Sequence, residues 1–230
     1  RSTLFPYTTL FRSSYLGSKK SGKYDWFNRS KMANGMIGKR ALMAADDEPQ
    51  DINVYVDVSG SMDTELLAII CKSLVVFAKE YKYSAINIVP WSSTAGEITN
   101  IPSNNFRNID KVIDTIIDAV ETGQSSTGGG TSTSAMIGSM IKILSQPVKQ
   151  KKDDMHFIIS DGETDHNIYE TAIIKSIENE FGSKVARSVA KRTCWMIYNT
   201  NTSIKEKFED DVKLGMFVFL NPKIIKESNK

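Results

Sequence analysis

The chain has 230 residues, of which 40% are hydrophobic and 24% are charged, and its formal net charge is only +2. This composition suits a globular protein with one full core, and the near-neutral charge gives no argument for binding nucleic acid or an anionic membrane. The two cysteines are too few for a disulfide framework, and no apolar stretch is long enough to span a bilayer. We therefore expect a cytoplasmic protein that binds neither nucleic acid nor membrane.

The first 50 residues need separate treatment. Residues 3–13 resemble the translation of a widely used sequencing adapter, so we set residues 1–13 apart as an artefact. We expect the chain to be a fragment whose own amino terminus is missing. Residues 14–50 contain several glycines and many basic side chains, which predicts an irregular lead-in, and residues 221–230 are expected to be a tail.

Between residues 51 and 220, short apolar runs alternate with helical stripes. Strands are predicted at 51–58, 84–91, 155–160, 194–198 and 216–220, with a short antiparallel edge strand at 96–101. Helices are predicted at 64–83, 106–120, 134–144, 203–210 and 168–192, the last broken near Gly182. This alternation predicts one α/β domain over residues 51–220. Its mostly parallel, doubly wound, Rossmann-like sheet would carry helices on both faces.

Polar side chains follow three of the predicted elements on one edge of this sheet. Asp57, Ser59 and Ser61 end the first strand, Thr131 closes a glycine-rich loop at 123–131, and Asp161 ends the strand at 155–160. Open α/β sheets bind ligands at the carboxyl ends of their strands. Carboxylate and hydroxyl oxygens suit a hard cation such as Mg²⁺, although aspartates and serines at strand ends also cap helices and fill turns.

These five residues resemble the metal-ion-dependent adhesion site of the von Willebrand factor type A (VWA) domain. That family has an aspartate and two serines spaced by single residues, then a distant threonine and a distant aspartate, and all five positions match here. The resemblance implies an Mg²⁺ site, with Mn²⁺ or Ca²⁺ as alternatives. It also implies an open coordination position for an Asp or Glu of a partner protein. It implies a binding module, not an enzyme.

Five further residues are expected to form the rim that a partner would contact. They follow the strands or flank the metal ligands at the same edge, and they are Trp91, Ser92, Gly130, Glu163 and His166. Strand capping is the alternative for the first two, and a solvated turn is the alternative for His166.

A second resemblance concerns the partner. The segment Ser21-Gly22-Lys23-Tyr24-Asp25, followed by basic residues near Lys39-Arg40, is similar to the segment before the VWA domain in bacterial and phage proteins that work with MoxR-type AAA+ ATPases. Cobaltochelatase-type chaperone subunits share that layout. The resemblance implies an AAA+ ATPase as a partner.

Two alternative functions stay open at this point. A haloacid-dehalogenase-like Mg²⁺ phosphatase would use Asp57 as nucleophile, with Thr131, Lys151 or Lys152, and the acidic loop at 160–165. That family has a second aspartate two residues after the nucleophile, but here the position is Ser59, so the general acid/base is missing. An extracellular adhesin would use the same five-residue site and differ only in its location.

Overall fold

The computed structural model describes residues 50–62, 64–80, 83–146, 154–163 and 169–220. The predictions for residues 1–49 and for the tail at 221–230 lie outside these residues. The described chain forms six strands, which are β1 (Asp51–Asp57), β2 (Ala85–Trp91), β3 (Thr99–Pro102), β4 (Met155–Ser160), β5 (Thr193–Tyr198) and β6 (Met216–Leu220). They make one sheet in the order β3-β2-β1-β4-β5-β6.

The order of the strands puts β1 near the middle of the sheet, between β2 and β4. Both neighbours run parallel to β1, as β5 and β6 do to their own neighbours. Only β3 is antiparallel, and it pairs with the outer side of β2. The predicted α/β class is confirmed, including the short antiparallel strand at one edge. Because β1, β2 and β4 are parallel, their carboxyl ends lie along the same edge of the sheet.

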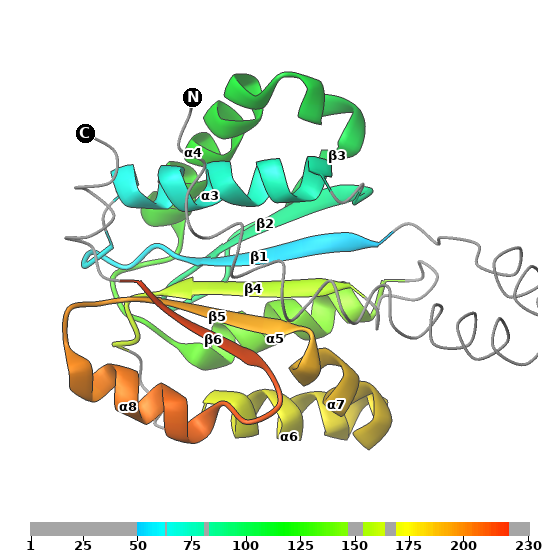
Figure 1. Ribbon diagram of the computed structural model, residues 1–230, viewed down its shortest axis with the longest axis vertical. Coiled ribbons are helices and arrows are strands. Elements are labelled where there is room, and N and C mark those ends of the chain that lie inside the picture. The colour runs from blue at the N-terminus through cyan, green and yellow to red at the C-terminus, as the bar shows by residue number, and fades with distance from the viewer. Residues whose placement is uncertain (1–49, 63, 81–82, 147–153, 164–168, 221–230) are drawn as a thin grey trace, which may run out of the picture. The chain divides into compact units, whose positions relative to one another are not determined.

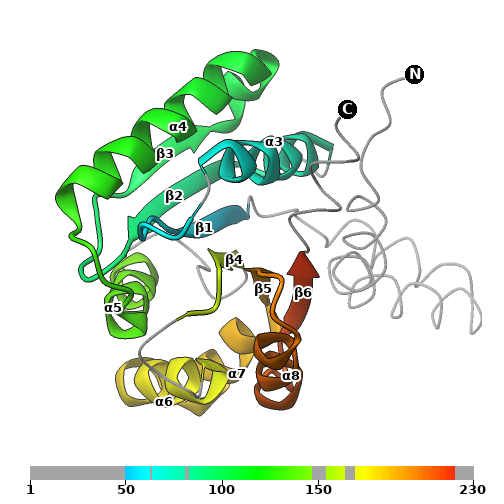
Figure 2. The ribbon, with the colours of Figure 1, turned by 90° about the vertical axis from the view of Figure 1, so that its left-hand side faces the viewer.

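Helices cover both faces of the sheet, as Figures 1 and 2 show. On one face lie α3 (Thr64–Glu80) and α4 (Ile109–Ser126), with the short 3₁₀ helix η1 (Ser103–Arg107) before α4. On the other face lie α5 (Thr133–Leu144), α6 (Tyr169–Phe181), α7 (Ser183–Lys191) and α8 (Thr202–Asp211). None of the helices in the described ranges has the length and apolar character needed to cross a membrane.

The strands are buried on both faces because helices cover both. All of β2, β4 and β5 is buried, and β1 is buried except at its first residue. This explains why these strands have continuous apolar runs instead of an alternating pattern. One cluster of the core lies between the sheet and α5, α6, α7 and α8, and its largest members include Tyr55, Trp91, Trp195 and Phe208.

Two glycines test the predicted bounds of the helices, and one of the two bounds was wrong. The break near Gly182 is confirmed, because α6 ends at Phe181 and Gly182 has a φ of +82°. The predicted loop at 123–131 was too long, since α4 continues to Ser126. Gly123 lies within α4, where a Cβ atom would be 2.3 Å from Cβ of Pro90. The glycine therefore lets α4 approach β2 closely and does not mark a loop.

Candidate functional site

The last residue of β1 provides the innermost group of the site. Asp57 is fully buried, and both of its carboxylate oxygens accept hydrogen bonds. Oδ1 accepts from the backbone N–H of Ser59 at 2.9 Å, and Oδ2 accepts from the hydroxyl of Ser160 at 2.7 Å. Asp57 is therefore held in a fixed orientation beneath the loop that carries the two serines.

A chain of contacts continues from this loop to the end of β4. The hydroxyl oxygens of Ser59 and Ser61 are 3.2 Å apart, and the Ser61 hydroxyl donates a hydrogen bond to Oδ2 of Asp161. Ser59 and Asp161 are buried, whereas Ser61 is exposed. The structure thus brings together four of the five predicted residues, Asp57, Ser59, Ser61 and Asp161.

Thr131, the fifth predicted residue, lies on a separate loop at the same edge. This loop is tied to the end of β2, because the N–H of Ser132 donates to the carbonyl oxygen of Ser92 at 2.8 Å. The end of β2 is in turn tied to β1, since the N–H of Val58 donates to the carbonyl oxygen of Trp91 at 2.9 Å. Thr131 is partly exposed, and no hydrogen bond joins it to another described residue. Its hydroxyl is therefore available to a ligand.

Two residues of the site were not predicted from the sequence. Ser160 bridges the two aspartate loops, because it donates to Asp57 and accepts from the N–H of Gly162 at 3.0 Å. The side chain of Asn199, just after β5, donates to the carbonyl oxygen of Asp161 at 2.9 Å. The one signal in the sequence that could have indicated Ser160 is its place at the end of β4, directly before Asp161.

The predicted rim residues have different surroundings. Trp91 is 1% exposed and Ser92 is 0% exposed, so neither is accessible to a partner in this structure, and their burial does not fit a place on a rim. Trp91, the last residue of β2, packs in the core, and Ser92, the next residue, is covered by Thr127 and Gly128. Gly130 and Glu163 are exposed at the carboxyl edge, where the N–H of Glu163 also donates to Oδ1 of Asp161 at 2.9 Å. His166 lies outside the described residues.

Burial is the main influence on the ionisation of Asp57. Burial raises the pKa of Asp57 above its usual value, and the nearby Asp161 raises it further, while hydrogen bonds from Ser59 and Ser160 oppose this. Desolvation and a like charge both disfavour the ionised form, whereas a cation placed nearby would favour it.

The donor set is all oxygen. The four residues in contact supply two carboxylates and the hydroxyls of Ser59 and Ser61, and the loop at the same edge offers the hydroxyl of Thr131. In the described parts of the chain, no group of three or more His, Cys, Asp or Glu side chains could hold a metal ion. The 3.2 Å between the two serine oxygens is close to the ~3.0 Å between neighbouring ligands in an octahedron with bonds of about 2.1 Å. These residues therefore fit a small divalent cation that keeps several waters.

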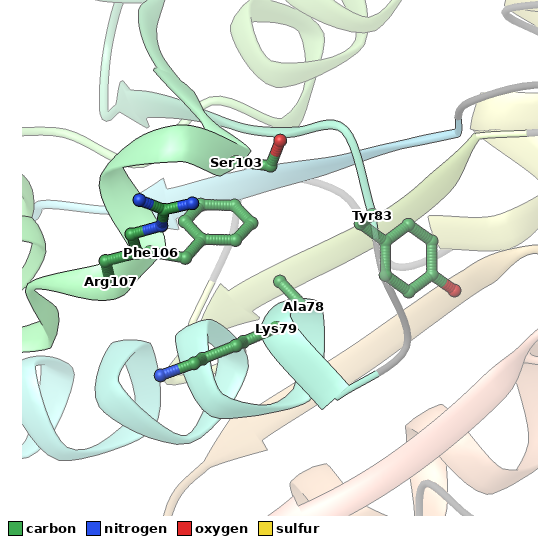
Figure 3. A pocket seen from close by; sticks show the side chains of 6 residues that line it. All are labelled: Ala78, Lys79, Tyr83, Ser103, Phe106 and Arg107. Carbon is green, nitrogen blue, oxygen red and sulfur yellow. The ribbon is translucent and has the colours of Figure 1, made fainter.

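A pocket at the other end of β2 has a different chemistry (Figure 3). It has a volume of about 270 Å³ and is lined by residues from the end of α3, the chain before β2, and η1, namely Ala78, Lys79, Tyr83, Ser103, Phe106 and Arg107. The lining includes two cations and no carboxylate. The two cations would repel a metal ion, and the pocket lies at the amino end of β2, away from the five residues described above.

Comparisons with known proteins found similarity only at the level of structure. No family model matches the chain, and no curated protein matches it. BatB from Bacteroides thetaiotaomicron is 13% identical, with a TM-score of 0.49 over 78% of this chain and 97% of that one. Manganese-loaded TRAP from Plasmodium vivax is 15% identical, with a TM-score of 0.48 over 80% and 72%.

A third similar structure is the VWA domain of SpRpn10, at 7% identity and a TM-score of 0.47 over 79% of this chain and 94% of that one. Identities of 7–15% concern the fold alone. The α/β class of this chain follows from its own fold, since the residues that the structure describes form five parallel strands and one antiparallel edge strand, with helices on both faces.

Proposed function

We propose that this chain is a VWA-type module that binds a partner protein through a divalent metal ion. The observation that carries the proposal is the continuous set of contacts from Asp57 through Ser59 and Ser61 to Asp161. The carboxylates of this set are buried, and the hydroxyl of Ser61 is exposed. Such a site can hold Mg²⁺ from the protein side and leave the outer side for water or for a carboxylate of the partner.

In this proposal the chain's residues have different roles. The hydroxyls of Ser59, Ser61 and Thr131 would contact the metal directly. Both oxygens of Asp57 already accept internal hydrogen bonds, so Asp57 would orient the serine loop and supply charge. Asp161 would likewise orient the loop after β4 and supply charge. Its position is fixed by hydrogen bonds from the N–H of Glu163 and the side chain of Asn199. Bound Mg²⁺ would supply an electrophilic centre for an Asp or Glu of the partner.

Binding, and not catalysis, is the function that we propose. The phosphatase alternative needs Asp57 as a nucleophile, but this carboxylate is fully buried and both of its oxygens accept hydrogen bonds. We expect that the protein does not hydrolyse a generic phosphomonoester between pH 5 and 9. Turnover that Asp57→Asn abolishes would favour the phosphatase.

We further propose that the partner is an AAA+ ATPase and that the module works in the cytoplasm. The support is the resemblance of residues 21–25 to the lead-in of such proteins. The two cysteines, which are free thiols, are also typical of a reducing compartment. Co-purification with an AAA+ ATPase, with release by EDTA, is expected. Binding that survives EDTA would contradict the metal-dependent mode.

Metal-induced stabilisation tests the core of the proposal without knowledge of the partner. At an Mg²⁺ or Mn²⁺ concentration 100 times Kd, the free energy of unfolding should rise by about 2.7 kcal/mol, which is a rise in Tm of roughly 5–10 °C. Asp161→Asn should abolish this rise, whereas Asp114→Asn, an exposed carboxylate on α4, should keep it. An equal response of both variants would refute the assignment of the site.

A further inference from the structure

Ser92, which directly follows β2, has three hydrogen-bonding partners for its side-chain hydroxyl. It is fully buried, and its hydroxyl oxygen lies 2.8 Å from the carbonyl oxygen of Thr127, 2.8 Å from the Thr127 hydroxyl and 2.7 Å from the carbonyl oxygen of Gly128. The Thr127 hydroxyl also donates to the carbonyl oxygen of Gly123 at 2.8 Å. The single proton of the Ser92 hydroxyl is therefore shared among three acceptors of residues 127 and 128, while the Thr127 hydroxyl donates its own proton back to α4.

The same short segment also holds the other end of the loop. The carbonyl oxygen of Ser92 accepts from Ser132, as described above, and the hydroxyl of Ser93 accepts from the N–H of Gly130 at 2.9 Å. A Cβ atom at position 130 would lie 2.7 Å from this hydroxyl, so a glycine is needed for the contact. The loop 127–132 is thus fixed on both sides of Thr131 by residues that follow β2.

The residues after β2 are also fixed relative to the serine loop of β1. Asp57 and Trp91 are partners in the parallel pairing of β1 and β2, and Val58 bonds to the carbonyl oxygen of Trp91. Ser92 therefore stands between the loop that carries Ser59 and Ser61 and the loop that carries Thr131. Thr131 itself has no hydrogen bond to a described residue, so its position depends on how its loop is held.

We propose that Ser92 is a positioning residue of the metal site, which sets Thr131 at the distance that a shared cation requires. This inference rests on the proposed function. Ser92 does not contact the cation; it acts through Thr131. Its loss would leave the Gly128 carbonyl without its hydroxyl donor. The first half of the loop would then be tied to the residues after β2 only through Thr94 and Thr127, so it would be held less firmly. Removal of groups that orient metal ligands commonly weakens metal affinity ten- to a hundredfold, roughly.

The test is a double-mutant comparison of Mn²⁺ affinity, measured by electron paramagnetic resonance on the full chain. Ser92→Ala should weaken binding about tenfold or more. Combined with Thr131→Ala, it should weaken binding no further than Thr131→Ala alone, because Ser92 acts through that residue. Ser125→Ala is the matched control, since its exposed hydroxyl bonds only within α4.

Each outcome decides a separate question. Unchanged affinity in Ser92→Ala, or an equal additional loss in both the wild-type and the Thr131→Ala backgrounds, overturns the inference. A loss of stability in the metal-free protein without a loss of affinity marks Ser92 as merely structural and also overturns it. Should Ser92→Ala fail to fold, Thr127→Val removes the partner hydroxyl and the same criteria apply. Equal binding by wild type and Asp161→Asn would instead refute the metal site itself.

Discussion

Replacing Gly162 by alanine should destabilise the protein strongly, although it adds one methyl group. Gly162 follows Asp161 and has a φ of +80°, a conformation that costs a residue with a Cβ atom about 1–2 kcal/mol. The new Cβ would lie 2.8 Å from Cγ2 of Ile204 and 3.1 Å from both Cγ2 of Ile197 and Cε2 of Phe208. Overpacking of this kind costs about 1–3 kcal/mol. We therefore expect a loss of about 3 kcal/mol.

Urea unfolding followed by circular dichroism measures this loss, with Gly138→Ala as the matched control. Gly138 lies within α5, and a Cβ atom there would meet nothing within 4 Å. The control should gain roughly 0.5–1 kcal/mol, because alanine favours a helix. The two substitutions thus have opposite expected signs. If Gly162→Ala stays within about 1 kcal/mol of wild type, the packing of α8 against the Asp161 loop is not as tight as the structure indicates.

Two other predictions concern groups away from the proposed metal site. The buried carboxylate of Glu170 accepts hydrogen bonds from the backbone N–H groups of Lys213, Leu214 and Gly215. Glu170→Ala should therefore lower the free energy of unfolding, measured in urea, by about 2–4 kcal/mol, and Glu170→Gln by roughly half of that. Equal losses in the two variants would show that the charge of Glu170 is unimportant. Burial raises the pKa of the Cys71 thiol from 9.0 to about 12, so native protein at pH 8 should not react with a thiol reagent until it unfolds. Because the unfolded thiol ionises first, the Cys71 contribution to stability should be lost between pH 9 and 12, at up to about 1.4 kcal/mol per pH unit. Burial also raises the pKa of Cys194, so the stability of Cys71→Ala should still fall in this range, but less steeply than that of the wild type. A rapid reaction of the native thiols would contradict the observed burial.

The strands and the metal-site motif were predictable because their signals are local. A strand buried on both faces needs a continuous apolar run, and β1, β4 and β5 have one. Asp57 and Asp161 end such runs, so parallel strand order alone puts them on one edge. Gly182 likewise separates α6 from α7, because a positive φ favours glycine.

Other features were not predictable because they depend on what packs against a residue from far along the chain. Gly123 follows a helical stripe in the sequence, but only the approach of Pro90 explains why it is a glycine within α4. Ser92 was expected on an exposed rim, and it is buried because the loop at 127–132 folds over it. In neither case does the local sequence contain the partner that decides the outcome.

The sheet, its helices and the five oxygen-bearing residues at its edge can be read from residue types and their spacing. How these five residues are held is visible only in the folded chain, where Ser160 bridges Asp57 to the Asp161 loop and Ser92 anchors the loop of Thr131. The difference arises because apolar periodicity is a property of neighbours in sequence. A hydrogen bond between residues 103 positions apart, such as Ser160 to Asp57, is a property of the folded chain alone.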